Sequence, residues 1–418
     1  MGSIMADLPD ASSPSLILTQ PTHQECIRTW SQTHPKWGPA LSLQDYLDRE
    51  SYLSTVPVAK DGGITRWILT DPSLPPNHRP ILSSCEALRK RAVYCKPTAD
   101  GMPPSVVDGL AHGMGSVWTD PQYRGKGYAS RMMRELVARL REYEAGSGSS
   151  TAGSDAGSPS AGSGHDATGK PAPGTPLFSV LYSDIGKKFY ARSGWAPFAS
   201  AHLSFPPATE PSRPQNGDAN GGKRHAKAVG YHEIAELCSV DEKILRETLP
   251  RRASDSGRTC VALLPNLDSI LWHLMREDFM TKHIFGRTPV VRGAVYGEPG
   301  RRVWAVWTRG YYGGLKKMEG NTLHILRFVI EAEDEPAEYL ADAVRSIVQI
   351  AQAEALEWRS QDVQTWNPSP ELRRAVEQSG LPFEFVDRDN DSIASLMWYG
   401  EEPTSELDWV LNEKFAWC

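Results

Sequence analysis

The residues best suited to chemistry form one short segment in the N-terminal half of the chain. Two glycines separated by a single residue are flanked by an arginine and a lysine in the segment Gln122-Tyr123-Arg124-Gly125-Lys126-Gly127-Tyr128-Ala129-Ser130. A strand-like run precedes the segment, and a helical pattern follows it. The first N–H groups of a helix and the positive end of its dipole attract anions, and glycine lets a backbone approach a ligand closely. The segment predicts a phosphate or diphosphate site, although an ordinary strand–turn–helix corner would use the same residues.

The elements that must position this segment alternate between strands and helices. Residues 110–119 form the strand-like run that leads into it. Apolar residues then recur three and four apart, as in an amphipathic helix, at Met132, Met133, Leu136, Val137, Leu140 and Tyr143. The other elements predicted for this half are strands over 15–19, 65–69, 81–94, 177–182 and 195–205 and helices over 22–30, 43–53 and 185–193.

Two stretches rich in small and polar residues indicate how the chain is divided. Residues 146–175 consist mainly of Gly, Ser, Ala and Pro, so they bury too little apolar surface to fold and predict a flexible insertion. The second stretch, residues 206–226, predicts a linker between domains. We therefore expect an N-terminal domain over 1–205 and a C-terminal domain over 227–418.

The C-terminal part lacks a glycine-rich segment, yet its elements repeat the order seen before. They are predicted as a strand over 322–330, a long helix with Pro336 near its first turn, a strand over 363–366, a helix over 371–379 and strands over 383–387 and 393–399. This order predicts a degenerate repeat that shapes the substrate pocket, and an unrelated α+β cap is the alternative. Five strands in a common order would distinguish the repeat from the cap.

Composition excludes several classes of function. The net charge of −6 argues against nucleic acid as the main partner, because binding phosphates requires a concentrated basic face. No run approaches the ~18 apolar residues that a membrane span needs. The six cysteines are scattered without a CxxC pair, so we expect no metal site and no disulfide framework. Together with an N-terminus that lacks a secretory signal, this predicts a reduced, cytoplasmic protein.

A second motif follows the predicted strand over 177–182. Phe189-Tyr190 and Gly194-Trp195 match a Phe-Tyr-x-x-x-Gly-Phe pattern, with Trp for the last Phe. With these residues the chain resembles the GNAT acetyltransferase superfamily, whose Gln/Arg-x-x-Gly-x-Gly/Ala motif is matched by Gln122, Gly125 and Gly127. The resemblance covers residues 15–205. It implies an α/β (α+β) GNAT fold with a mixed twisted sheet, to which the C-terminal part would add an α+β domain.

A narrower similarity is to the fungal lysine N-acetyltransferases, which carry a second, C-terminal half. The runs that carry it are Ile81-Leu82-Ser83-Ser84-Cys85-Glu86, Ser116-Val117-Trp118-Thr119, Leu181-Tyr182-Ser183-Asp184-Ile185-Gly186-Lys187-Lys188-Phe189-Tyr190 and Asn412-Glu413-Lys414-Phe415-Ala416-Trp417-Cys418. This resemblance implies an enzyme that moves an acetyl group from acetyl-CoA to an amine.

The superfamily resemblance implies roles for individual residues. Arg124 through Ser130 would hold the diphosphate of coenzyme A, Val117 and Thr119 its pantetheine arm, and an N–H near Trp118 or Thr119 would polarise the thioester carbonyl. Tyr190 would protonate the departing thiolate, although a core tyrosine would fit the same pattern. Ser183 stands where many members have an asparagine. The coenzyme-binding set is Val117, Trp118, Thr119, Arg124, Gly125, Lys126, Gly127, Tyr128, Ala129, Ser130, Ser183 and Phe189.

The acceptor amine must lose a proton before it can attack. A lysine-type ammonium has a pKa of ~10.4, so deprotonation at pH 7 costs roughly 4–5 kcal/mol. Three groups are candidates for the base: Glu86, Asp184 and the C-terminal carboxylate of Cys418. Each candidate also has an alternative role. Glu86 fits a surface charge equally well, Asp184 fits a cap of the next helix, and the tail that ends at Cys418 fits a purely structural role.

The acceptor that we expect is a small primary amine, with the side-chain amine of free L-lysine, in lysine catabolism, as the leading candidate. Acetylation of a protein lysine or of a toxin or drug amine is the alternative enzyme reaction. A non-enzymatic scaffold that binds acetyl-CoA is the third hypothesis. The sequence leaves the oligomeric state open.

Overall fold

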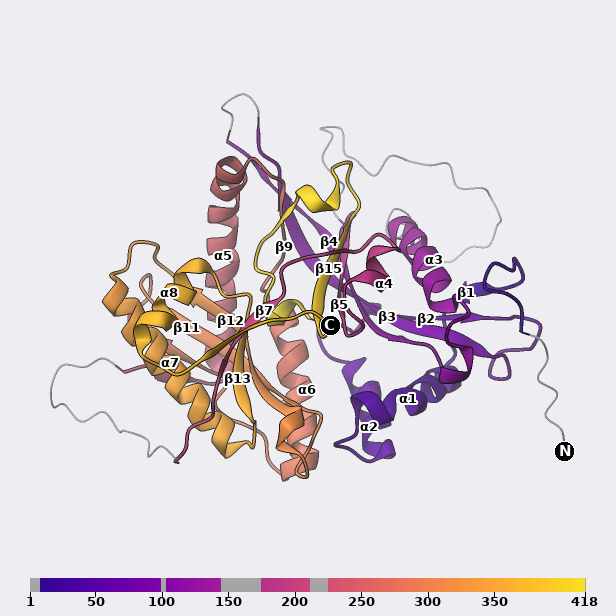
Figure 1. The fold of residues 1–418 in the computed structure, drawn as a ribbon, viewed down its shortest axis with the longest axis horizontal. Coiled ribbons are helices and arrows are strands. Elements are labelled where there is room, and N and C mark those ends of the chain that lie inside the picture. The colour runs from indigo at the N-terminus through magenta and orange to yellow at the C-terminus, as the bar shows by residue number, and fades with distance from the viewer. Residues whose placement is uncertain (1–7, 99–102, 144–173, 211–224, 418) are drawn as a thin grey trace.

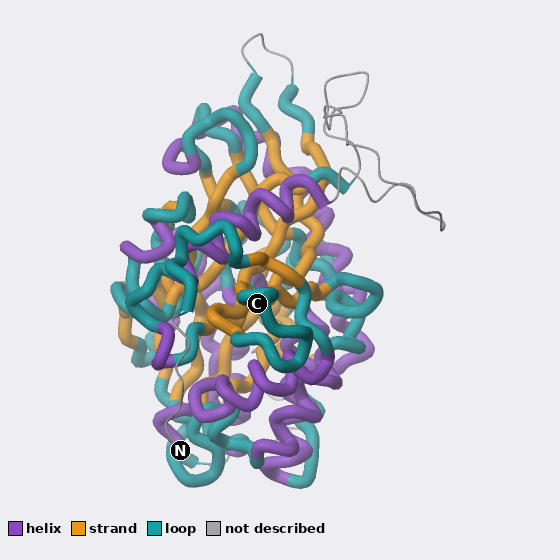
Figure 2. Tube along the Cα trace, turned by 90° about the vertical axis from the view of Figure 1, so that its right-hand side faces the viewer, coloured by secondary structure: helices purple, strands orange, loops and turns teal. Residues whose placement is uncertain are grey.

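Two mixed β-sheets with helices packed around them make up the structure (Figure 1). The computed structural model describes residues 8–98, 103–143, 174–210 and 225–417. Most of the predicted insertion over 146–175 and of the predicted linker over 206–226 lies outside these residues. A view from the side shows strands running through the middle of the molecule and helices toward the outside (Figure 2).

The first sheet is built mainly from the N-terminal half. Its order is β1 (Ile17–Thr19), β2 (Ile64–Thr70), β3 (Ile81–Cys95), β4 (Val106–Trp118), β5 (Pro176–Ser183), β15 (Ile393–Trp398) and β6 (Ala196–Pro197). Two further strands extend it at the far end of β3: β9 (Cys260–Leu263) and β16 (Asp408–Trp409).

The second sheet is built mainly from the C-terminal half. From one edge to the other its order is β8 (Lys227–Val229), β10 (Gly293–Tyr296), β11 (Val303–Tyr311), β12 (Asn321–Ile330), β13 (Asp362–Trp366), β7 (Ala201–Phe205) and β14 (Glu384–Asp387).

The two sheets repeat one topology over seven successive positions. In each, the first four strands are antiparallel, the fourth and fifth are parallel, and the last two pairings are antiparallel again. A long helix makes both parallel crossovers: α3 (Tyr128–Tyr143) joins β4 to β5, and α7 (Ala337–Glu357) joins β12 to β13. Seven strands in a common order exceed the five that a repeat requires. The C-terminal half therefore fits a repeat and not an unrelated cap.

The equivalent crossovers differ sharply in charge. Where β4 leads to α3 through a glycine-rich segment with Arg124 and Lys126, β12 leads to α7 through Glu331-Ala332-Glu333-Asp334-Glu335-Pro336. Arginines pair with three of these four carboxylates: Arg302 with Glu331, Arg251 with Glu333 and Arg301 with Glu335. The second crossover has no glycine between residues 331 and 336, so it lacks the loop that the first crossover uses.

The two halves exchange strands across the predicted division into 1–205 and 227–418. β7 follows β6 in the chain but pairs with β13 and β14 in the second sheet. In return, β15 lies between β5 and β6 in the first sheet, and β9 pairs with β3. The strand predicted over 195–205 is thus two strands in different sheets, because alternation of apolar residues predicts a strand without identifying its neighbours.

A fragment of residues 1–205 is expected not to fold on its own. It would lack β15, whose six residues pair with β5, and β9, which covers the end of β3. We expect weak near-ultraviolet dichroism and no cooperative urea transition, whereas the full chain unfolds cooperatively. Co-expression with residues 206–418 should restore the folded signal. Cooperative unfolding of the isolated fragment would contradict the exchange.

Local sequence signals explain where several helices begin. The helices are α1 (His23–Trp37), α2 (Leu43–Leu53), α3, α4 (Lys188–Ala191), α5 (Tyr231–Ser256), α6 (Leu267–Phe285), α7 and α8 (Pro370–Ser379). Thr22 and Glu25 form a capping box before α1, and Ser42 caps α2. α5 is the longest of these helices and continues through Pro250.

One hydrophobic cluster joins the halves. It contains Phe178 and Trp398 from the first sheet together with Trp304 and Leu326 from the second, all at most 6% exposed. The two sheets therefore share a core, and residues of both halves can line one site.

Among the described residues, no helix combines the length and apolar character required to cross a bilayer.

Candidate active site

The glycine-rich segment connects β4 to α3 in a conformation that only glycine adopts easily. Gly125 and Gly127 have φ of +77° and +86°, a region that L side chains rarely enter. A Cβ atom at Gly125 would meet nothing within 4 Å, and one at Gly127 would meet only Ala11 at 3.4 Å. The backbone angle, rather than lack of space, thus accounts for the two glycines.

The start of α3 provides backbone donors beside this loop. The first helical bond runs from the N–H of Arg131 to the carbonyl of Gly127 at 3.1 Å, so the preceding N–H groups have no acceptor within the helix. Arg124 Nε donates to the carbonyl of Thr119 at 3.0 Å, and its guanidinium lies 4.9 Å from the ring centre of Trp118. The loop therefore places N–H groups and a cation together, as an anion site requires.

β4 and β5 separate next to the loop. Their parallel pairing ends at Met114 and Leu181, whereas β4 continues to Trp118 and β5 to Ser183. A bulge at Ser116, which has φ of +51°, bends β4 at this point. The separated edge of β4 can therefore pair with an extended ligand, as the pantetheine arm of coenzyme A would require.

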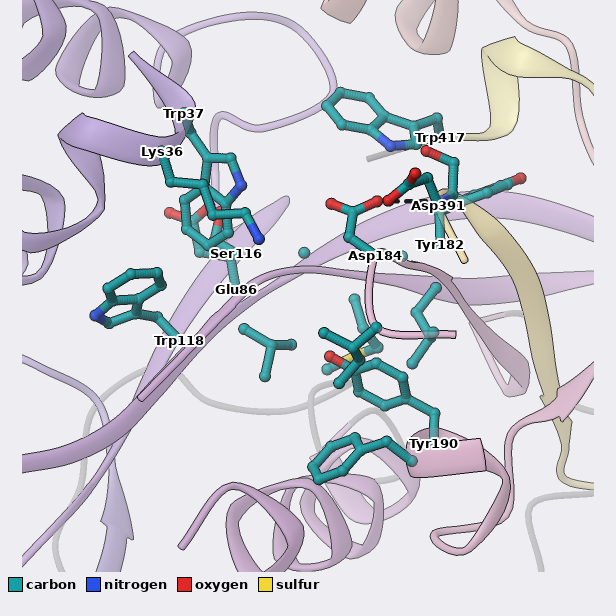
Figure 3. Close-up of a pocket in the computed structure, with 18 of the residues that line it drawn as sticks. Lys36, Trp37, Glu86, Ser116, Trp118, Tyr182, Asp184, Tyr190, Asp391 and Trp417 are labelled. Atoms are coloured by element: carbon teal, nitrogen blue, oxygen red, sulfur yellow. Dashed lines mark hydrogen bonds between the residues drawn. The ribbon is translucent and has the colours of Figure 1, made fainter. Parts of the chain in front are cut away.

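A large, continuous cavity runs from the loop into the second half of the molecule. Its volume is about 1340 Å³, and its lining includes Val117, Trp118, Thr119, Tyr123, Arg124, Gly125, Gly127, Tyr128, Ala129, Ser130, Phe189 and Tyr190. Figure 3 shows Glu86, Ser116 and Trp118 on one side of this cavity and Tyr182, Asp184 and Asp391 on the other. The cavity brings most of the predicted coenzyme-binding residues together.

Two predicted coenzyme-binding residues do not line the cavity. Lys126 is exposed and outside the lining. Ser183 is 2% exposed, and its hydroxyl donates to the carbonyl of Gly186 at 2.8 Å and accepts the N–H of Ile185 at 3.3 Å. Ser183 therefore fixes the turn after β5, and Lys126 is positioned to act only through long-range charge.

Tyr190 lies on the short helix α4 and faces the cavity. Its side chain is 8% exposed, and its ring packs edge-on against Phe189 at 4.9 Å between centroids. Burial, with smaller contributions from Cys85 and Asp184, raises the pKa of Tyr190 above its ordinary value. The phenol therefore stays protonated at neutral pH, which suits a proton donor. Tyr190 also belongs to the hydrophobic cluster under α3, which fits the alternative of a core tyrosine.

Glu86 lines the cavity, but its carboxylate is already engaged. Arg66 Nε lies 2.8 Å from Glu86 Oε1, and Ser116 donates its hydroxyl to Oε2 at 2.8 Å. These bonds hold the bulged residue of β4 in place. Because Arg66 and Ser116 occupy both carboxylate oxygens, Glu86 is better placed to fix the bulge than to contact an acceptor amine.

Asp184 faces the cavity and does not cap a helix. The helix predicted to begin at Ile185 begins at Lys188 and has no side-chain cap. Asp184 instead accepts the N–H of Ser392 through Oδ1 at 3.1 Å, which ties the end of β5 to the segment before β15 (Figure 3). Among the described residues it forms no ion pair. Asp184 is therefore an available carboxylate at the junction of the two halves.

The C-terminal tail reaches the wall of the cavity. Cys418 itself lies outside the described residues, but Trp417 is part of the lining. Lys90 Nζ donates to the carbonyls of Ala416 at 2.9 Å and Trp417 at 3.0 Å, and His273 Nε2 lies 3.1 Å from the carbonyl oxygen of Phe415. These contacts fix the tail against both halves.

Residues of the second half form a wall that the sequence analysis did not predict. Its members are His202, His324, Gln364, Trp366, Arg388 and Lys414. They come from β7, β12, β13, the segment after β14 and the tail, and the exchange of β7 adds His202 to this wall. The nearest signal in the sequence was the aromatic character of the C-terminal half.

His202 should make stability depend on pH. Burial, together with the Arg388 charge, lowers its pKa to about 4 from an ordinary 6.5. Between these values the unfolded state binds more protons, so stability is present above pH 6.5 and is lost as pH falls toward 4. We expect a loss of about 2–3 kcal/mol between pH 7 and 4, measured by urea unfolding. His202→Gln should reduce this slope, and an unchanged slope would contradict a neutral, buried imidazole.

Comparison with protein families identifies both halves of the chain. A model described as the acetyltransferase (GNAT) family matches residues 98–153, which include the glycine-rich loop. A model described as the LYC1 GNAT-like C-terminal domain matches residues 202–418, which include the second sheet and the tail. The second match agrees with the repeated topology.

Individual relatives are distant. A protein named lysine acetyltransferase from Yarrowia lipolytica is 24% identical over 96% of this chain and 99% of its own length. Uncharacterized protein YGR111W of Saccharomyces cerevisiae is 29% identical over 58% of this chain and 59% of its own length. Among solved structures, the S. cerevisiae N-myristoyltransferase with bound myristoyl-CoA covers 95% of this chain and 82% of its own at 8% identity and a TM-score of 0.48. A GCN5-related N-acetyltransferase from Anabaena variabilis covers 91% and 72% at 12% identity and a TM-score of 0.45.

Proposed function

Because this chain belongs to the family defined by the LYC1 GNAT-like C-terminal domain, we propose that it acetylates a small primary amine, with the side-chain amine of free L-lysine as the leading acceptor. The GNAT match in its N-terminal half makes it an acetyltransferase. The observation that carries the proposal is the cavity of about 1340 Å³, which runs from the glycine-rich loop past Tyr190 into the second half. A cavity walled by two halves suits a small acceptor.

Acetyl-CoA fits the part of the cavity formed by the first half. The N–H groups at the start of α3 and the Arg124 guanidinium would hold its diphosphate. The separated edge of β4, from Val117 to Thr119, would pair with its pantetheine arm. When bound there, acetyl-CoA supplies an acetyl group as a reactive thioester. The equivalent crossover of the second half, residues 331–335, contains no glycine and so offers no such loop for a second diphosphate.

Two side chains transfer protons in this proposal, Asp184 as the acceptor and Tyr190 as the donor. Asp184 takes the proton of the acceptor ammonium, since Glu86 is engaged by Arg66 and Ser116 while Asp184 accepts only a backbone N–H among the bonds of the described residues. Tyr190 holds its phenolic proton at neutral pH and donates it to the leaving sulfur. The amine nitrogen gains a bond to the acetyl carbon as the carbon–sulfur bond breaks. The nitrogen then loses its second proton, which replaces the one that Tyr190 gave to the sulfur, and Asp184 releases the first proton to solvent. No oxidant is needed.

The test is a screen of amines in which release of coenzyme A is measured together with the mass of the product. Free L-lysine, a lysine-containing peptide, spermidine and an aminoglycoside represent the rival acceptors. We expect L-lysine to be acetylated fastest and to gain one acetyl group at its side-chain nitrogen. Turnover only of the peptide would favour a protein substrate. Binding of acetyl-CoA without turnover of any amine would support the scaffold hypothesis and overturn the proposal.

A further inference from the structure

Arg388 is a buried cation in the wall that the second half contributes to the cavity. Its side chain follows β14, lines the cavity and is 8% exposed as a residue. The guanidinium carbon lies 4.0 Å from the ring centre of Trp366, so the planar group stacks on the indole. This stacking fixes the direction of the side chain.

No carboxylate neutralises this guanidinium within the described part of the chain. Arg388 donates from NH1 to the carbonyl of Ala201 at 3.0 Å, and NH1 lies 3.4 Å from Nδ1 of His202. Its NH2 makes only a long contact of 3.5 Å with the carbonyl of Ser392, and its Nε has no partner among the described residues. A buried charge without an ionic partner is costly, so this arrangement fits a site whose counter-ion arrives with the ligand.

The groups around Arg388 are two neutral imidazoles, a second cation and the carboxylates of Asp387 and Asp389, of which Asp387 acts on Arg388 through its charge. Burial keeps the pKa of His202 at about 4 and that of His324 well below its ordinary value, so both imidazoles are neutral at pH 7. Lys414 places a second ammonium 4.1 Å from the ring centre of Trp366. The nearby carboxylate of Asp389 is paired with Lys187 at 2.6 Å.

Carboxylates line the same cavity. Glu86 lies on one wall, and Asp184 and Asp391 lie on the other (Figure 3). Ser392 connects Asp184 to Arg388, because its N–H is donated to Asp184 Oδ1 at 3.1 Å and its carbonyl lies 3.5 Å from Arg388 NH2. The cavity thus presents a carboxylate and a guanidinium on either side of one residue. A ligand with an ammonium at one end and a carboxylate at the other matches this polarity.

We propose that Arg388, stacked on Trp366, binds the carboxylate of the acceptor, so that the acceptor is a free amino acid and not a lysine within a polypeptide. Arginine is suited to this task because its planar fork can bind both oxygens of a carboxylate. A peptide bond in place of the carboxylate would leave the buried guanidinium without a counter-ion. The inference rests on the proposed acetyltransferase function and adds the feature of the acceptor that is recognised.

The first test varies the acceptor and leaves the protein unchanged. L-lysine, 6-aminohexanoate and L-lysinamide share the reacting amine, and only L-lysinamide lacks the carboxylate. We expect kcat/KM for L-lysinamide to be roughly 10- to 100-fold below that for L-lysine, the range expected for charge-assisted hydrogen bonds. 6-Aminohexanoate should retain measurable turnover. Equal turnover of L-lysine and L-lysinamide would overturn the inference and leave the acetyltransferase proposal intact.

The second test varies Arg388. Arg388→Met should raise KM for L-lysine by roughly 10- to 100-fold and change kcat/KM for L-lysinamide less than about threefold. Arg388→Lys should restore part of the affinity, since it keeps the charge and loses the planar fork. Arg287→Met is the matched control, because Arg287 also stacks on a tryptophan, Trp358, at 4.2 Å and lies outside the cavity lining.

The two tests separate the possible failures. If no amine is acetylated, the proposed function fails. If amines are acetylated and Arg388→Met lowers turnover of L-lysine and L-lysinamide equally, Arg388 is structural and the inference fails. If Arg388→Met does not fold, as judged by circular dichroism, the comparison of L-lysine with L-lysinamide on the unaltered protein still decides whether the acceptor carboxylate is recognised.

Discussion

Gly127→Val is expected to lower the affinity for coenzyme A on the order of 100-fold while the protein remains folded. Gly127 has φ of +86°, and a β-branched residue in this region costs about 1–3 kcal/mol. The loop would relax to another conformation and turn the first N–H groups of α3 away from the diphosphate. Loss of two charge-assisted hydrogen bonds of about 1.5 kcal/mol each accounts for the expected decrease. Isothermal titration with coenzyme A measures it.

Gly300→Val is the matched control for this prediction. Gly300 has φ of +85°, lies in the turn between β10 and β11 and would place a Cβ atom in open space. The two variants carry the same backbone strain, and only one of them alters the loop at the cavity. We expect similar losses of stability and full affinity for coenzyme A in Gly300→Val. Unchanged affinity in Gly127→Val would contradict the assignment of the diphosphate to this loop.

Tyr190→Phe is expected to lower kcat by about 100-fold or more, the range in which general acids contribute. The substitution removes one hydroxyl and keeps the ring that packs against Phe189. Affinity for coenzyme A should therefore change less than about twofold. Because burial raises the pKa of Tyr190, the phenol is protonated throughout the neutral range, and the effect should not vary between pH 6 and 8. Steady-state kinetics at saturating acetyl-CoA measure it.

Tyr311→Phe tests whether loss of any buried hydroxyl would have the same effect. Tyr311 is 2% exposed and donates its hydroxyl to the carbonyl of Trp358 at 3.0 Å, away from the cavity. This variant should lose some stability and keep its kcat. A Tyr190→Phe enzyme with an unaltered kcat would leave Tyr190 as a core residue and remove the proton donor from the mechanism.

Local sequence patterns predicted most elements of the fold but not their pairing. α2 occupies 43–53, as the apolar spacing predicts, and α3 begins directly after Gly127. The short strand β9 was not predicted, because four apolar residues fit a strand or a buried loop equally well. Membership of β7 and β15 in the opposite sheets depends on contacts between residues far apart in the chain, and such contacts leave no local periodicity.

The same limit applies to the site. The loop at Gly125 and Gly127 was predictable because its function requires a local backbone conformation. Arg388 was not, because the run Asp387-Arg388-Asp389-Asn390-Asp391 has the composition of an exposed turn. Burial of Arg388 results from Trp366 and β7, which belong to other parts of the chain. Residues whose role is created by distant packing require the structure.

The acidic crossover between β12 and α7 has a consequence for how such proteins can diversify. In the proposed arrangement the first half alone binds acetyl-CoA, so substitutions in the second half would leave the donor reaction unchanged. Substitutions on β13 or near Arg388 would therefore change which amine is accepted and leave the proposed acetyl-CoA site unaltered. The second half repeats the topology of the first without its glycine-rich loop, so its residues can change the acceptor specificity independently of the donor site.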